Sequence, residues 1–153
     1  MKKLSLLFFI LMLGMGAFAQ TTRYWSGKST TTDKIDDKTN WWGGVNPNSG
    51  DHLEFNNTNG RYWAYSNYGS GSWFGNIMIY EGAGSIKFLG DNTYAYKFEN
   101  NSENELFEIA NDRIGNRLGG NLEINPVGTG GILVSGSYIS LDGAKTLHFY
   151  GAN

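Results

Sequence analysis

The stretch Ile86–Phe98 reads IKFLGDNTYAYKF, and a weaker version of it, ISLDGAKTLHF, follows at Ile139–Phe149. The two stretches align without a gap, with identical residues at Ile86 and Ile139, Gly90 and Gly143, and Thr93 and Thr146. In each stretch apolar and polar residues alternate, a glycine follows, and the alternation resumes. Alternation with a period of two is typical of a strand that buries one face, and glycine favours a turn. The pattern therefore predicts strand, tight turn and strand, twice over.

Short apolar segments of the same kind fill the chain from residue 76 onwards. The clearest are Ile77–Tyr80, Leu106–Ile109, Leu122–Ile124 and Ile132–Val134. The 22 glycines, set against only 2 prolines, indicate many turns between these segments. No convincing apolar stripe with a helical period of about 3.6 residues occurs beyond position 20. The sequence therefore predicts an all-β protein.

Two all-β architectures fit these short strands. In a β-solenoid, each strand buries one face, a turn redirects the chain, and the next coil covers the last. In an antiparallel β-sandwich, the same strands pair as hairpins. The spacing between Ile86 and Ile139 leaves room for two coils of about 20 to 29 residues each. The loops also vary in length, which a solenoid tolerates because its loops project outward, so we favour the solenoid.

The segment 1–19 has the features of a secretory signal peptide. Lys2 and Lys3 begin it, Leu4–Leu13 is almost wholly apolar, and Ala17–Ala19 is a small-residue cleavage site. The apolar run is shorter than the roughly 20 residues that span a bilayer, so we expect no membrane insertion after cleavage; an uncleaved anchor is the alternative. The predicted organisation is a signal peptide at 1–19, an aromatic-rich N-terminal cap with loops at 20–75, and solenoid coils at 76–153.

Composition narrows the class of protein. Removing Lys2 and Lys3 from the 12 basic side chains leaves ten against 14 acidic ones, a net charge of −4. This charge argues against binding nucleic acid or an anionic membrane surface, because both attract basic patches. The chain has no cysteine, so no disulfide stabilises this predicted exported protein. An exported chain that is free of cysteine and rich in Gly and Asn suggests a bacterial origin.

The region 20–55 combines tryptophans with polar loops. Trp25 and Trp41 flank a polar stretch, Lys28–Lys38, which we expect to be a solvated loop. The two rings are expected to pack together, because large aromatic side chains bury much area and can close one end of a β structure. Asn111–Gly120 is interpreted as a second polar loop.

The N-terminal region resembles the start of bacterial autotransporter-type passenger proteins. The residues that carry this likeness are Trp25-Ser26-Gly27, Asn40-Trp41, Gly43-Gly44, Pro47, Gly50-Asp51 and Phe55. The strand units, I-x-[FL]-x-G-x-x-T-[YL]-x-[YF], are similar to autotransporter-associated β-strand repeats. The resemblance implies an exported right-handed parallel β-helix, displayed on the cell surface or released. Such proteins continue for many coils, so we expect this chain to be truncated or to stack on further coils or another chain.

The sequence contains no recognisable catalytic or metal-binding pattern. His52 and His148 are far apart and lack Cys, His or paired carboxylates at ligand spacing, so no metal or cofactor is expected. A β-helix polysaccharide lyase or hydrolase would need carboxylates on neighbouring coils. The predicted strands offer chiefly Glu108, Glu123 and Asp142, with no visible pairing. We therefore expect a protein that is not an enzyme.

The aromatic cluster carries the one functional signal. All five tryptophans fall between Trp25 and Trp73. If its members are exposed, the cluster offers a stacking platform for sugar rings; if they are buried, it caps the first coil, which is the interpretation we favour. The candidate carbohydrate-binding residues are Tyr62, Trp63, Tyr65, Tyr68 and Trp73.

Three functions remain open at this stage. The first is a non-enzymatic structural or adhesive β-solenoid segment, secreted or held at the bacterial cell surface, that presents loops to a glycan or protein partner. The second is a carbohydrate-binding module that uses the Trp and Tyr cluster. The third is a fragment of a polysaccharide lyase or hydrolase. Exposure of two or more rings on one open face favours the second, and burial favours the first.

Overall fold

The computed structural model describes residues 20–56, 62–67, 73–116, 120–136, 138–140 and 146–151. The predicted signal peptide and Tyr68 lie outside these ranges. The regular secondary structure of the described residues consists of strands and one short 3-10 helix, η1 (Lys38–Asn40), joined by turns and loops. The strands are β1 (Thr22–Trp25), β2 (His52–Phe55), β3 (Trp63–Ser66), β4 (Trp73–Ile79), β5 (Ile86–Gly90), β6 (Thr93–Asn100), β7 (Phe107–Asn111), β8 (Arg113–Gly115), β9 (Leu122–Pro126), β10 (Ile132–Val134), β11 (Tyr138–Ser140) and β12 (Leu147–Phe149).

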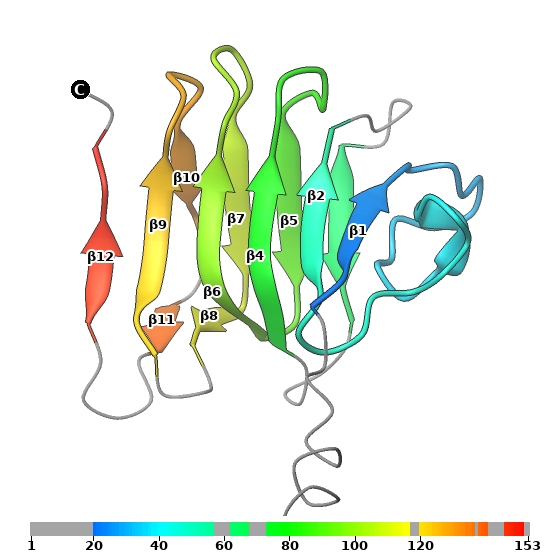
Figure 1. The fold of residues 1–153 in the computed structure, drawn as a ribbon, viewed down its shortest axis with the longest axis horizontal. Coiled ribbons are helices and arrows are strands. Elements are labelled where there is room, and N and C mark those ends of the chain that lie inside the picture. Colours follow the sequence, from blue (N-terminus) through cyan, green and yellow to red (C-terminus); the bar gives the residue numbers. More distant parts are fainter. Residues whose placement is uncertain are drawn as a thin grey trace, which may run out of the picture.

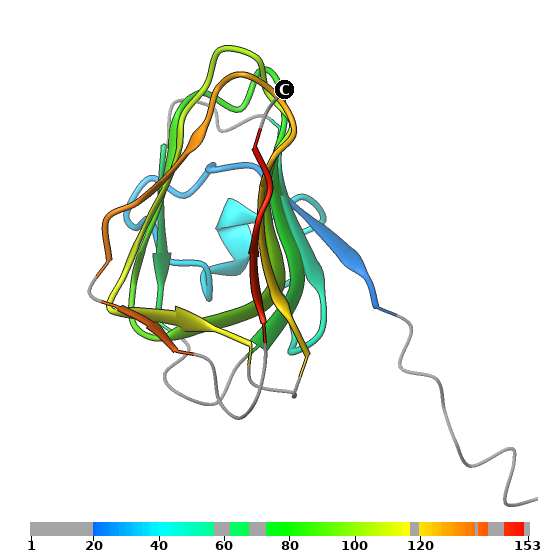
Figure 2. The ribbon, with the colours of Figure 1, turned by 90° about the vertical axis from the view of Figure 1, so that its left-hand side faces the viewer.

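These strands stack as a β-solenoid in which neighbouring strands of each sheet run parallel (Figure 1). The end-on view shows a three-sided tube (Figure 2). One side is a four-stranded sheet in the order β10-β7-β5-β3. The other two sides belong to an eight-stranded sheet that bends along β6, whose first residues pair with β8 and whose last residues pair with β9. We call these sides the β3–β10 wall, the β8 wall and the β9 wall.

The chain winds around the tube as a right-handed helix, as the two ribbon views show together. Parallel pairing in successive layers confirms the predicted solenoid and excludes the antiparallel sandwich, since a sandwich needs antiparallel hairpins. The parallel ladders already include β1, β2 and β3, so the coils begin before residue 76.

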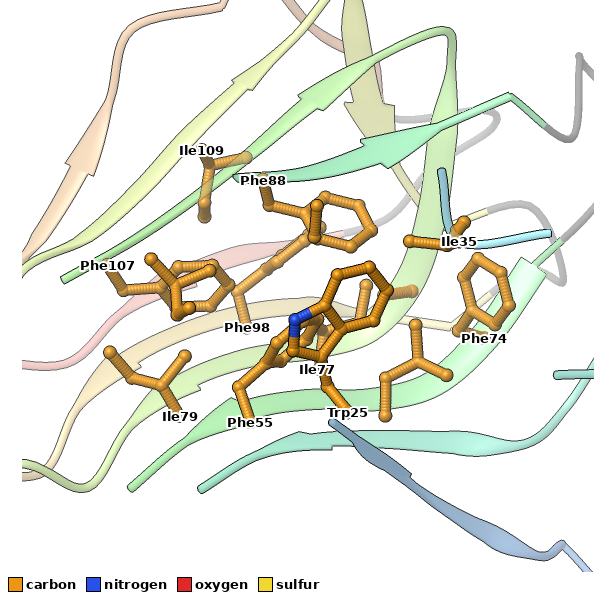
Figure 3. Close-up of a cluster of buried hydrophobic side chains, with 14 of the residues drawn as sticks. Trp25, Ile35, Phe55, Phe74, Ile77, Ile79, Phe88, Phe98, Phe107 and Ile109 are labelled. Atoms are coloured by element: carbon orange, nitrogen blue, oxygen red, sulfur yellow. The ribbon is translucent and has the colours of Figure 1, made fainter. Parts of the chain in front are cut away.

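The interior is a set of apolar ladders, one residue from each coil. On the β9 wall, Leu53 pairs with Ile77, Ile77 with Phe98, and Phe98 with Ile124. All four are buried. On the β3–β10 wall, the ladder Ala64, Phe88, Ile109 and Val134 faces them. Aromatic contacts join the two walls across the tube, such as Phe98 with Phe107 at 6.3 Å between ring centroids (Figure 3).

The ladders correct the predicted repeat. Ile86 lies on the β3–β10 wall and pairs with Phe107, whereas Ile139 lies on the β8 wall and pairs with Ile114. The true repeat is one coil, the step between neighbours on the ladder that begins at Leu53, and its length changes from step to step. Alternation and a glycine turn recur at several corners of the tube. An ungapped alignment across coils of unequal length therefore matched two different corners.

The N-terminal end is closed by the segment that follows β1. Trp25 and Trp41 pack edge to face with ring centroids 5.1 Å apart, which confirms their predicted contact. The indole N–H of Trp41 donates to the carbonyl of Ile35 at 2.7 Å. Ile35 is fully buried. The prediction that the whole stretch Lys28–Lys38 is a solvated loop is therefore wrong at Ile35. The predicted loop Asn111–Gly120 likewise contains β8, whose Ile114 is buried.

Candidate functional site

Two of the predicted aromatic residues, Trp63 and Tyr65, stand on the outer surface of the tube. Both lie on β3, where they alternate with buried Ala64 and Ser66. Their exposed fractions are 58% and 37%. Successive outward residues of a strand are about 6.6 Å apart, so the two side chains leave one surface as neighbours. The interpretation that these rings are buried in the cap is wrong, because Trp25 and Trp41 occupy that place.

The remaining members of the predicted cluster separate from this pair. Tyr62 precedes β3, is 49% exposed, and packs against the turn at Gly84, where an added Cβ would lie 2.2 Å from the ring. Trp73 begins β4 and pairs with Tyr94 of β6, which places it on the β8 wall. Its ring contacts Tyr96 edge to face at 5.5 Å. Of the predicted cluster, Trp63 and Tyr65 therefore lie together and Tyr62 lies at their margin, whereas Trp73 lies on a different wall.

The edge of β3 is covered by the segment that leads into the cap. The N–H of Tyr65 donates to the carbonyl of Asp33 at 2.8 Å, and the N–H of Ile35 donates to the carbonyl of Tyr65 at 3.0 Å. Lys34 therefore forms an isolated parallel β-bridge with Tyr65 on that edge. This pairing fixes the backbone beneath the two rings on both sides, because β5 pairs with the other edge of β3.

The outer surface next to Trp63 is polar. The register places Lys87 of β5 beside Trp63, and Glu108 of β7 beside Lys87. Lys87 Nζ lies 2.8 Å from Glu108 Oε1, and the hydroxyl of Ser135 donates to the same oxygen at 2.7 Å. The hydrogen bonds from Lys87 and Ser135 lower the pKa of Glu108 from its usual value of 4.5. We call Trp63, Tyr65, Lys87 and Glu108 the aromatic face.

Sequence reasoning identified only half of the aromatic face. Trp63 and Tyr65 were named as candidates, and Glu108 was noted only as a strand carboxylate. Lys87 lies at the outward position of the stretch IKFLG, where alternation gives the signal. To place Lys87 beside Trp63, one must know how many residues make up the coil between them. The pairing of β3 with β5 in the structure gives this number. The ungapped alignment of two different corners concealed the length of that coil.

A second outer surface carries carboxylates on the β9 wall. Glu54 of β2 and Glu99 of β6 both pair with Met78 of β4, one on each side. Burial raises the pKa of Glu54. Glu99 accepts one hydrogen bond from Asn101 and one from Asn125, and its Oε2 lies 3.3 Å from Lys97 Nζ.

The hydroxyl of Tyr80 lies in the same region as these two carboxylates. Burial raises the pKa of Tyr80 first, and the charges of Glu54 and Glu99 raise it further. Neither Glu54 nor Glu99 belongs to the sites predicted from the sequence, and the two lie on strands on either side of β4. Their position therefore comes from the structure and had no counterpart in the predicted sites.

The predicted histidines take part in ordinary strand contacts. His52 Nδ1 accepts a hydrogen bond from the N–H of Asn76 at 2.8 Å, and the ring of His148 stacks with Tyr150 at 6.1 Å. Among the described residues, no group of three or more His, Cys, Asp and Glu side chains is placed to hold a metal ion. In the same ranges, no helix is long and apolar enough to cross a bilayer.

Comparisons with protein-family models, with curated proteins and with solved structures give no match for this chain. The likeness to autotransporter passenger proteins therefore stays a prediction from the sequence.

Proposed function

We propose that this chain is a non-enzymatic adhesive segment of an exported bacterial protein, and that its aromatic face binds carbohydrate. The single observation that carries this proposal is the exposure of Trp63 and Tyr65 side by side on the outer surface of β3. Large aromatic side chains are costly to leave in water, and a rigid exposed pair of them marks a binding surface. Export is supported by the predicted signal peptide, and an adhesive role by the resemblance to passenger proteins.

The chemistry of the aromatic face suits a sugar. The faces of a pyranose ring present C–H groups that pack on an indole or phenol ring, while its hydroxyls point sideways. On this surface, Lys87 lies on the strand next to Trp63, and Glu108 lies one strand further on, in contact with Lys87. The parallel strands hold both kinds of contact in fixed positions, so little conformational freedom is lost on binding.

A glycan array with the secreted form of the chain, residues 20–153, tests this proposal. The variants are Trp63→Ala and Tyr65→Ala. The matched control is Trp42→Ala, because Trp42 is a 48% exposed tryptophan that lies in the cap under Lys28 Nζ. We expect glycan binding by the wild type, a loss of about tenfold or more in Trp63→Ala, a smaller loss in Tyr65→Ala, and no change in the control. An array without any binding, or an equal loss in Trp42→Ala, would contradict the proposal.

A second candidate is a glycoside hydrolase or lyase site on the β9 wall. The placement of Glu54 and Glu99 on either side of Met78 favours it, because such a site needs two carboxylates on one surface, and burial raises the pKa of Glu54. The strands that carry Glu54 and Glu99 are separated by β4, so their backbones lie about 9.6 Å apart. Release of reducing ends or unsaturated products from polysaccharides, abolished by Glu99→Gln and retained by Trp63→Ala, would establish this activity.

A further inference from the structure

The neighbours of Trp63 limit which sugar the aromatic face accepts. Strands in a sheet are about 4.8 Å apart, so Lys87 lies one strand from Trp63 and Glu108 lies two strands away. A pyranose ring stacked on Trp63 therefore has its hydroxyls within reach of the Lys87 ammonium. A second ring of the same glycan, extending along the tube, reaches Glu108.

Both polar side chains keep hydrogen-bonding capacity for a ligand. An ammonium group has three donors, and Lys87 uses one of them on Glu108 Oε1. The oxygen Oε1 also accepts from Ser135, and the second carboxylate oxygen, Oε2, adds further acceptor capacity. The pair thus offers a donor and an ionised acceptor side by side. A sugar hydroxyl, which both donates and accepts, satisfies the two together.

The charge of the aromatic face is balanced. The positive charge of Lys87 and the negative charge of Glu108 face each other at 2.8 Å. Lys34, at the margin beside Tyr65, has Asp33 and Asp36 close to it in sequence, so that margin adds no net positive charge. A carboxylated sugar would bring its charge close to Glu108 and gain no uncompensated cation in return.

From this geometry we infer that the aromatic face takes an uncharged, hydroxyl-rich glycan, with Lys87 and Glu108 as the residues that select it. The inference depends on the proposed carbohydrate binding and adds the class of ligand and the residues that decide it. Trp63 supplies the stacking surface, and the Lys87–Glu108 ion pair forms hydrogen bonds with the sugar hydroxyls.

Isothermal titration calorimetry with the full secreted chain tests the inference. The probes are cellohexaose and mannohexaose as uncharged ligands and hexagalacturonate as the anionic one, each at low and high salt. The variants are Lys87→Met, Glu108→Gln and Trp63→Ala. Lys28→Met is the matched control, because Lys28 also lies beside an exposed tryptophan ring but in the cap.

We expect at least one uncharged oligosaccharide to bind with an affinity that salt leaves unchanged, and hexagalacturonate to bind more weakly. Lys87→Met and Glu108→Gln should each weaken the uncharged ligand by about tenfold, the loss typical of a hydrogen bond to a charged group. Glu108→Gln should also improve the relative affinity for hexagalacturonate, since it leaves Lys87 uncompensated. Lys28→Met should match the wild type.

The outcomes separate this inference from the proposed function. Tighter, salt-sensitive binding of hexagalacturonate that Trp63→Ala abolishes would overturn the inference and leave carbohydrate binding intact. Binding of an uncharged ligand that depends on Trp63 but not on Lys87 or Glu108 would do the same. No binding of any oligosaccharide would overturn both. Circular dichroism checks that each variant is folded. We expect all of them to fold, because the substituted side chains face outward and are not part of the core.

Discussion

At the scale of single residues, buried asparagines hold the corners of the tube. Asn100 ends β6 and is fully buried. Its Nδ2 donates to the carbonyls of Glu105 at 2.8 Å and Gly131 at 2.6 Å, and its Oδ1 accepts from the N–H of Ser102 at 2.9 Å. Gly131 belongs to the next coil, so this one amide ties its own turn to the turn stacked upon it. Buried backbone groups need such partners because no water reaches them.

We predict that Asn100→Ala lowers the free energy of unfolding by about 2–4 kcal/mol, because it removes three hydrogen bonds and leaves the N–H of buried Ser102 without its acceptor, while the Glu105 and Gly131 carbonyls each keep one donor. Asn101→Ala is the control. That neighbour is only half-buried and its side chain donates one hydrogen bond, to Glu99 Oε1 at 2.9 Å, so the loss of this side chain should cost about 1 kcal/mol or less. Urea denaturation followed by fluorescence of the tryptophans measures both values. Equal effects of the two substitutions would contradict the proposed role of Asn100.

Sequence reasoning at this scale succeeded where a residue type has a single physical preference. Trp25 and Trp41 were predicted to pack because large aromatic rings seek burial, and they do. Ile35 was missed because its sequence neighbours are polar, and its burial depends on how the segment folds over the end of the tube. Trp63 and Tyr65 show the opposite case. Their exposure follows from the pleat of β3 and from which side faces the core, which composition alone does not reveal.

At the scale of the strands, ion pairs connect neighbouring coils on the outer surface. Lys87 on β5 and Glu108 on β7 form one such pair, and it lowers the pKa of Glu108 below 4.5. A carboxyl whose pKa is depressed by folding stabilises the folded state above its unfolded pKa. That contribution disappears as the pH falls through the lower, folded value. The pair is partly exposed, so its contribution is modest, about 1 kcal/mol or less.

We predict that wild type and Glu108→Gln differ in stability at pH 7 and converge as the pH falls below 4.5. The direction follows from the lowered pKa, because protonated Glu108 resembles the glutamine. Guanidinium chloride raises the ionic strength and screens the pair, so urea denaturation at a series of pH values is the suitable measurement. A stability gap that stays constant from pH 7 to pH 3 would show that the Lys87–Glu108 pair does not contribute in this way.

The strands themselves were largely predictable, and their partners were not. Segments such as Ile77–Tyr80 and Leu122–Ile124 were found from apolar runs bounded by Gly and Asn; the first overlaps the last three residues of β4, and the second forms the first three residues of β9. β8 was missed because it is short and only Ile114 and Gly115 are buried within it. Pairing depends on coil lengths, which differ between successive steps of the ladder on the β9 wall. An alignment without gaps cannot follow such variation. For this reason it matched Ile86 with Ile139, although the two residues lie on different walls of the tube.

At the scale of the whole molecule, each coil contacts mainly its neighbours, so stability is local along the tube. The cap protects the first coils: Trp41 packs on Trp25 and on Phe55, whose ring centroid is 6.3 Å away. The Nε1–H of Trp41 also anchors the backbone of Ile35. The sequence predicted coils with an aromatic cap and left the antiparallel sandwich as the alternative; the solenoid was favoured because loops of varying length can project outward from a stack, and the parallel pairing confirms it.

Removing the ring of Trp41 should therefore loosen the tube from one end. We predict that Trp41→Ala lowers stability by about 3–5 kcal/mol, the usual cost of truncating a buried aromatic residue. Amide hydrogen exchange read by mass spectrometry should show the largest loss of protection in β1, β2 and β3, and the smallest in β9. Trp42→Phe is the control, since this neighbouring ring lies on the surface and should leave the exchange pattern unchanged. A loss of protection that is uniform from β2 to β9 would mean that the tube unfolds as one cooperative unit, and that the cap does not act locally.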